Sequence, residues 1–181
     1  MITEVQRNHL AKAVRPMQII VGALAASVAM FLVIVLVIAD KKPLPQPFLT
    51  YVALGFAVVA FAGWLIVPGR VVDQARKAIA EGRAPSSSAQ TAVALEVGVV
   101  GQLASVFQTR LIIACALLEG AAFFNLVVYM IEAQYLSLVI AIVLLLIIVS
   151  QIPTRNRLED WITHELETIE QMRARFPKFP S

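Results

Sequence analysis

One acidic residue interrupts a long, otherwise uncharged apolar stretch. Glu119 lies between Leu111 and Ile131, eight residues beyond the start of that stretch. At a helical rise of about 1.5 Å per residue, this places it about 12 Å into a hydrocarbon layer roughly 30 Å thick. An ionised carboxylate at that depth costs a few kcal/mol, so burial favours the protonated form. Exchange of a proton or a small cation is the chemistry that such an acid supports, and Glu119 is our candidate binding residue.

Several small or polar residues fall at a similar depth in the neighbouring apolar stretches. Ser27 and Asn125 could hydrogen-bond to Glu119, and three small residues would let other helices approach it closely: Ala25, Ala57 and Ala60. The fourth stretch is bulky at this level, around Leu144, so we expect it to face lipid more fully than the first three. Three roles for Glu119 stay open: structural glue between helices, ion or proton exchange, and contact with another ligand.

Soluble catalytic chemistry is not indicated. The sequence contains no phosphate-binding G-x-x-x-x-G-K-[ST], no G-x-G-x-x-G, no H-E-x-x-H and no G-x-S-x-G motif. Cys115 is the only cysteine, and we interpret it as a small packing residue. The two histidines, His9 and His164, lie in the polar ends of the chain. We therefore expect a protein that is not an enzyme and has no metal site and no cofactor.

The elements that would position Glu119 are membrane-spanning helices. Hydrophobic residues make up 59% of the chain and charged residues 15%, whereas an average soluble domain has about 45–50% and about 25%. The apolar residues form four stretches near the roughly 20 residues that a transmembrane helix needs: Met17–Ala39, Phe48–Val67, Leu111–Ile131 and Tyr135–Ile152. The sequence predicts an all-α polytopic membrane protein with four transmembrane helices and cytoplasmic amphipathic helices.

Basic residues predict the orientation. Thirteen Lys and Arg residues flank the stretches on one side and only Lys41 and Lys42 lie on the other, so both termini should be cytoplasmic. We expect an integral protein of the bacterial inner membrane. Its five segments would be an N-terminal cytoplasmic segment (1–16), a first hairpin (17–67), a cytoplasmic helical connection (68–110), a second hairpin (111–152) and a C-terminal amphipathic helix (153–181).

The polar segments leave some alternatives open. Thr3–Arg15 is either a short interfacial helix or a frayed terminus. Val71–Glu81 should continue the second span inward. Ala89–Thr109 is either an interfacial helix or an inward extension of the third span. A fifth span over 89–107, with a tight external turn at 108–110, would leave the bases after residue 153 outside, against the charge rule.

The C-terminal segment has the pattern of an amphipathic helix. Asn156 followed by Glu159 has the form of a capping box. Apolar residues follow on one helical face: Leu158, Ile162, Leu166, Ile169, Met172 and Phe176. Early acids and late bases suit the helix dipole. We expect residues 156–176 to pack against the middle connection, a second subunit or a cytoplasmic protein partner. The alternative is a helix that lies on the membrane surface.

The third stretch resembles a known family. Arg110 to Val128 is similar to the carboxylate-bearing helix of rotary ATPase proteolipids, the c-subunits, with its Ala-Leu-x-Glu core, aromatic residue and Leu-Val-Val. In that family the Glu binds the translocated H⁺ or Na⁺ in a homo-oligomeric ring. The resemblance covers this helix alone and implies that role for Glu119 alone.

We therefore expect a homo-oligomeric membrane protein with Glu119 at a buried helix interface, where it either holds helices together or exchanges a proton or cation. Its partners would be the lipid bilayer and further copies of the chain, with no nucleic acid. Two alternatives remain open at this stage. One is a scaffold or assembly subunit that binds a partner through its cytoplasmic helices, and the other is a small ion channel lined by Glu119.

Overall fold

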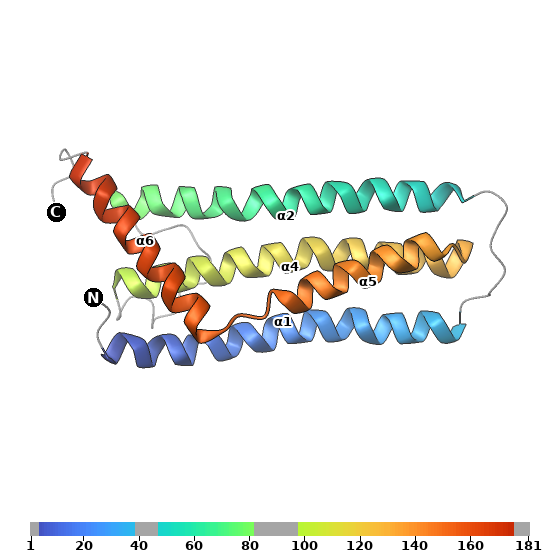
Figure 1. Ribbon diagram of the computed structural model, residues 1–181, viewed down its shortest axis with the longest axis horizontal. Helices are drawn as coiled ribbons and strands as arrows, with labels where there is room; N and C mark the ends of the chain where they lie inside the picture. Colours follow the sequence, from blue (N-terminus) through green and yellow to red (C-terminus); the bar gives the residue numbers. More distant parts are fainter. Residues whose placement is uncertain (1–3, 39–46, 82–97, 176–181) are drawn as a thin grey trace. The chain divides into compact units, whose positions relative to one another are not determined.

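The computed structural model describes residues 4–38, 47–81 and 98–175. Every regular element in these ranges is a helix. The helices (Figure 1) are α1 (Glu4–Ile38), α2 (Phe48–Ala80), α4 (Val99–Glu132), α5 (Tyr135–Ser150) and α6 (Arg155–Arg175). The all-α prediction is confirmed for this part of the chain.

Three helices are long and apolar enough to cross a membrane. The candidate spans are Ala13–Ile38, Phe48–Ile79 and Val99–Glu132. Helix α5 has 16 residues and counts as a fourth only if it is joined to Arg155–Met172, from which it is bent by 73°. The chain therefore has the helices of an integral membrane protein.

Helix α4 settles how the third apolar stretch begins. It runs without interruption from Val99 to Glu132. The tight external turn at residues 108–110, which a fifth span would need, is absent because these residues are helical. Residues 99–109 therefore extend the third stretch, and residues 89–97 lie outside the described ranges. Helix α1 likewise starts at Glu4, so residues 4–15 are helical and not frayed.

The chain divides into two compact units. The apolar unit comprises Ile19–Val67 and Ile112–Ile152, and the terminal unit comprises Met1–Gln18, Pro68–Leu111 and Pro153–Ser181. Helices α1, α2 and α4 each contribute a segment to both units.

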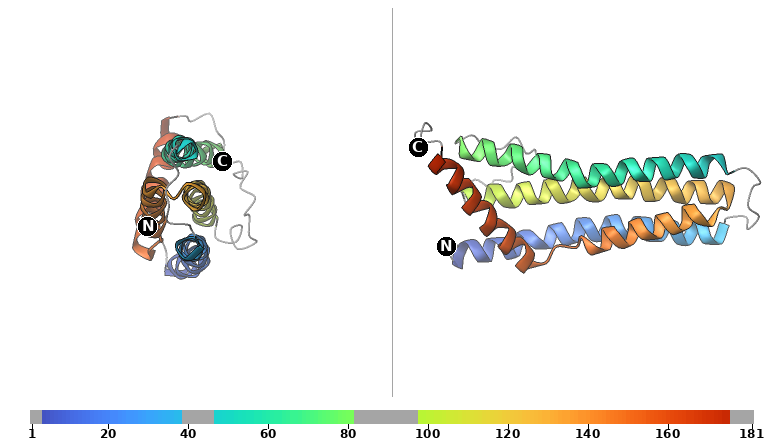
Figure 2. Two further views of the ribbon diagram at one scale, coloured as in Figure 1. Left: turned by 90° about the vertical axis from the view of Figure 1, so that its right-hand side faces the viewer. Right: turned by 45° about the horizontal axis from the view of Figure 1, so that its top comes forward.

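In the apolar unit, α4 lies between α1 and α2 (Figure 2). Half of the apolar window of α4 is buried (50%), against 22% for α1 and 22% for α2. Aromatic pairs line both contacts of α4: the rings of Phe31 and Phe123 are 5.2 Å apart, and those of Phe56 and Phe124 are 5.4 Å apart. We expected the fourth apolar stretch to face lipid more fully around Leu144. Instead, Leu144 is among the residues of α5 that are buried.

Small residues account for only part of this packing. A Cβ atom added at Gly63 would lie 3.4 Å from Leu117 Cδ1, so α2 and α4 are in close contact there. A Cβ atom at Gly22, Gly55 or Gly120 would meet nothing within 4 Å. No other described helix therefore approaches closely at these three glycines.

A two-residue turn joins α4 to α5. Ala133 has φ +53°, a left-handed conformation that side chains disfavour. Its backbone N–H donates to the carbonyl of Tyr129 at 2.8 Å, which is the usual way to end a helix at a left-handed residue. The hairpin is therefore held tightly, and the rings of Tyr129 and Tyr135 lie 6.3 Å apart across it.

In the terminal unit, α6 packs its apolar face against α2 and α4. Leu158, Ile162 and Ile169 are buried, as the spacing predicted, and Phe176 lies outside the described residues. Trp161 packs against Val72, Ala75 and Val106 of the two other helices, and its ring is 5.1 Å from that of Phe107. The apolar face is thus covered by the chain itself.

The start of α6 differs from the prediction. Thr154, not Asn156, is the cap: its Oγ1 accepts the backbone N–H of Arg157 at 3.4 Å, and α6 begins at Arg155. The hydroxyl of a capping Thr can accept the backbone N–H of the third residue after it. Thr154, the first residue after Pro153, therefore caps the helix. Glu159 instead pairs with Arg155, whose Nε lies 2.6 Å from Oε1.

Truncation of the buried face of α6 should destabilise the protein. Ile162 is fully buried, so Ile162→Ala should lower the free energy of unfolding by about 2–5 kcal/mol. The exposed Glu167 provides the control, because Glu167→Ala should change it by less than about 0.5 kcal/mol. Thermal unfolding in detergent, followed by tryptophan fluorescence, measures both. Equal midpoints for the two variants would contradict this packing.

Candidate functional site

Glu119 pairs with α1 inside the apolar unit. Its Oε1 accepts a hydrogen bond from Ser27 Oγ at 2.7 Å, and its side chain is partly buried. The rings of Phe123 and Phe31 are in contact one turn further along the same two helices, with an angle of 52° between their planes. Because both pairs advance together along the chain, α1 and α4 run parallel here, and Ser27 and Glu119 lie at one level.

The hydroxyl of Ser27 has two acceptors and one proton. Besides Glu119, the carbonyl oxygen of Leu24 lies 2.7 Å from Ser27 Oγ. With Glu119 ionised, the hydroxyl donates to the carboxylate. With Glu119 protonated, the carboxyl O–H donates to Ser27 Oγ and the hydroxyl donates fully to Leu24. The same geometry therefore accommodates both protonation states without movement of either helix.

The surface beside Glu119 is open. Four small residues on α1 and α4 that flank this pair are exposed: Ala23, Ala26, Ala116 and Gly120. A Cβ atom at Gly120 would meet nothing within 4 Å. Small, exposed side chains therefore adjoin the partly buried Glu119.

Asn125 belongs to a different contact. It is fully buried, and its Nδ2 donates to the carbonyl of Ala121 at 2.8 Å and to that of Ala53 at 3.5 Å. Its Oδ1 has no hydrogen-bond partner among the described residues. Asn125 thus joins α4 to α2, and the structure does not bring it to Glu119.

The small residues predicted around Glu119 have packing positions. Ala25 on α1 is buried, as are Ala57 and Ala60 on α2. Cys115, on α4, is also fully buried. These side chains fill the interior of the apolar unit, and none of them supplies a polar group to the carboxyl.

A second carboxylate, which the sequence analysis missed, lies at the end of α4. Glu132 is 3% exposed. It accepts the backbone N–H of Leu49 at 2.7 Å, the backbone N–H of Thr50 at 2.8 Å and the Thr50 hydroxyl at 2.7 Å. These amides belong to the first turn of α2, whose N–H groups lack partners within the helix. Glu132 therefore caps α2 from another helix.

The contact extends to α5, because Ser137 Oγ donates to Thr50 Oγ1 at 3.3 Å. In the sequence, Glu132 directly follows the third apolar stretch, which ends at Ile131. Its position in the sequence was an available signal. Where two spans run antiparallel, the end of one lies level with the start of the other, so an acid at the end of the third span falls near Thr50 at the start of the second.

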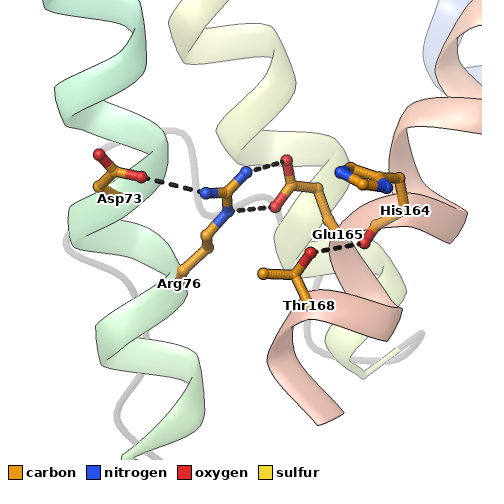
Figure 3. Close-up of polar contacts among 5 residues, drawn as sticks. All are labelled: Asp73, Arg76, His164, Glu165 and Thr168. Atoms are coloured by element: carbon orange, nitrogen blue, oxygen red, sulfur yellow. Dashed lines mark hydrogen bonds and ion pairs between the residues drawn. The ribbon is translucent and has the colours of Figure 1, made fainter. Parts of the chain in front are cut away.

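A third carboxylate lies in the terminal unit. Glu165 is 1% exposed. Both its oxygens pair with Arg76 of α2, through Nε and through a terminal nitrogen at 2.7 Å, and a further Arg76 nitrogen lies 3.1 Å from Asp73 (Figure 3). We had counted Glu165 among the acids that suit the helix dipole. Its spacing from Leu158 and Ile162 places it on the buried face, which was the available signal.

In the described ranges, no group of three or more His, Cys, Asp or Glu side chains could hold a metal ion. No protein-family model, curated protein or solved structure matches the chain. The geometry of the three carboxylates is therefore the basis for the functional argument.

Loss of the Glu132 cap should destabilise the apolar unit. Glu132→Gln places an amide N–H₂ against groups that are themselves donors, and Glu132→Ala removes the acceptor altogether. Each buried donor that loses its acceptor costs about 1–3 kcal/mol. Both variants should therefore unfold at a lower temperature in detergent than the wild type.

The exposed Glu170 offers a control with the same change of charge, and Glu170→Gln should leave the midpoint unchanged. A Glu132→Gln protein as stable as Glu170→Gln would mean that the cap contributes nothing.

Proposed function

We propose that this chain is a homo-oligomeric integral membrane protein, without enzymatic activity, in which Glu119 reversibly binds a proton or a small cation within the bilayer. The observation that carries the proposal is the hydroxyl of Ser27, which lies 2.7 Å from both Glu119 Oε1 and the Leu24 carbonyl. This arrangement provides hydrogen bonds for the ionised and the protonated carboxyl alike, so exchange costs little reorganisation.

Comparison with Glu132 favours exchange over a purely structural role. A carboxylate used to hold helices together has several donors and no access, as Glu132 does with three donors and 3% exposure. Glu119 has one donor among the described residues, Ser27, and is only partly buried. One hydrogen bond leaves lone pairs of the carboxylate available to an incoming proton or cation.

Oligomerisation is supported by the exposed small residues beside Glu119. Small side chains allow transmembrane helices to approach closely, and a polar group at such a contact is removed from lipid. The face of Ala23, Ala26, Ala116 and Gly120 suits a second copy of the chain. The resemblance of Arg110–Val128 to the proteolipid helix supports the same arrangement.

We further propose four spans with both termini in the cytoplasm. The excess of Lys and Arg on one side supports this orientation. Helix α5 with its 16 residues would be about 24 Å long, short for a span but entirely uncharged. A scaffold that binds partners through the apolar face of α6 is less well supported, because Leu158, Ile162 and Ile169 are already buried within the chain.

The topology can be tested with single cysteines in a Cys115→Ala background. Cysteines at Lys42 and at Ser87 should react with a membrane-impermeant maleimide from opposite sides of the membrane. The cysteine at Ser87 should react only after the cells are permeabilised. Labelling of both positions in intact cells would reject the four-span orientation.

The role of Glu119 can be tested by two substitutions and a reagent. Glu119→Gln keeps shape and hydrogen-bonding capacity but cannot ionise, so it should assemble normally and lose any pH- or ion-dependent signal. Glu119→Ala should lose the signal and also assemble less well, because it leaves a cavity. If Glu119 is only structural, the Glu119→Gln protein should assemble and respond to pH as the wild type does.

Carbodiimides provide an independent measurement, because they attack protonated carboxyl groups in apolar surroundings. Mass spectrometry should show modification of Glu119 that slows as pH rises, with Glu132 unmodified as an internal control. Glu119 that stays unmodified at every pH would indicate a sealed contact and contradict the exchange proposal.

A further inference from the structure

Arg110 occupies an unusual position in the terminal unit. It lies on α4, immediately before the apolar stretch that begins at Leu111, and its side chain is partly buried. Within the ranges that the structure describes, its guanidinium makes no hydrogen bond and no ion pair. A cation withdrawn from water without a partner is costly, so the position calls for an anion.

The neighbouring charges do not supply that anion. Glu165 attracts Arg110, but both its oxygens are already paired with Arg76. Arg76 and Arg157 act on Arg110 as like charges. Asp73, the other acid of this cluster, pairs with Arg76 and is largely exposed. Arg110 therefore lies within electrostatic reach of two other arginines, and the nearby acid Glu165 is already paired with Arg76.

The cluster also lies at a defined level of the chain. The apolar stretch of α4 starts one residue after Arg110, and the last apolar stretch ends at Ile152, just before α6. Lipid headgroups lie immediately outside the hydrocarbon layer, so Arg110 falls where their phosphates are. Helix α6 begins at Arg155, and the positive end of its dipole adds to the charge of Arg157 in its first turn.

We propose that Arg110, together with Arg157, binds the phosphate group of an anionic phospholipid at this boundary of the terminal unit. A guanidinium fork matches two phosphate oxygens, and basic sites at the ends of transmembrane helices bind such headgroups. The bound phosphate supplies to Arg110 the counter-ion that the described residues do not provide. This inference rests on the membrane location of the protein and not on any role of Glu119.

Stability in nanodiscs of two compositions tests the site: phosphatidylcholine alone, and phosphatidylcholine with phosphatidylglycerol. The wild-type unfolding midpoint should rise by about 5 °C or more with the anionic lipid. Arg110→Gln should lose this rise. Without anionic lipid it should be at least as stable as wild type, because an unpaired charge has been removed. Arg70, an exposed base of the same unit, gives the control: Arg70→Gln should keep the rise.

Two further measurements separate the sources of phosphate and guard against misfolding. Native mass spectrometry should find phosphatidylglycerol retained by the wild type and by Arg70→Gln, and lost from the exposed-site variant Arg157→Gln. Soluble glycerol phosphate added to phosphatidylcholine discs should give less than half of the rise. An equal rise would assign the site to free phosphate esters and overturn the lipid assignment. A full rise in Arg110→Gln, or an equal loss in Arg70→Gln, would overturn the site altogether.

Discussion

The carboxylate of Glu132 holds the ends of three helices together, and the apolar unit depends on it. Within hydrocarbon or at its edge, an unpaired backbone N–H costs several kcal/mol, and the first turn of a helix always carries such groups. Glu132 accepts two of them from α2, and Thr50 links the same point to Ser137 of α5. A single side chain thereby fixes where α2, α4 and α5 meet.

The carboxylates of Glu119, Glu132 and Glu165 are stabilised in different ways. Glu132 is stabilised by oriented N–H and O–H dipoles, and Glu165 by the opposite charge of Arg76. Among the described residues, Glu119 accepts a single hydrogen bond, from the hydroxyl of Ser27. Glu132 and Glu165 each accept more than one hydrogen bond. The number of donors, more than burial alone, distinguishes Glu119 from these two acids.

The sequence was informative where a local rule decides the outcome. The apolar stretches predicted the helices, and the spacing of Leu158, Ile162 and Ile169 predicted the buried face of α6. It was less informative for the start of α4, because residues 89–109 could form a separate interfacial helix or extend the third span, and from Val99 onward they extend it. Helical hydrogen bonds are made within the chain, so isolated polar side chains do not end a helix.

The pairings of Glu132 and Glu165 could not be read from local patterns. Their partners lie 82 to 89 residues away in the chain, and only the packing of helices brings them together. The cap of α6 shows the same limit at short range. Two residues, Thr154 and Asn156, could each cap the helix, and the choice depends on where the chain turns after Pro153.

The tight turn at Ala133 has a consequence for the order of assembly. Helices α4 and α5 are separated by two residues, so they can close into a hairpin as soon as both are synthesised, a local step that is fast compared with long-range docking. The first turn of α2 is made much earlier, and its acceptor on Glu132 does not exist until 82 residues later. Until then, the first turn of α2 lacks its acceptor on Glu132. The hairpin of α4 and α5 supplies that acceptor when it packs against α1 and α2, and this packing completes the apolar unit.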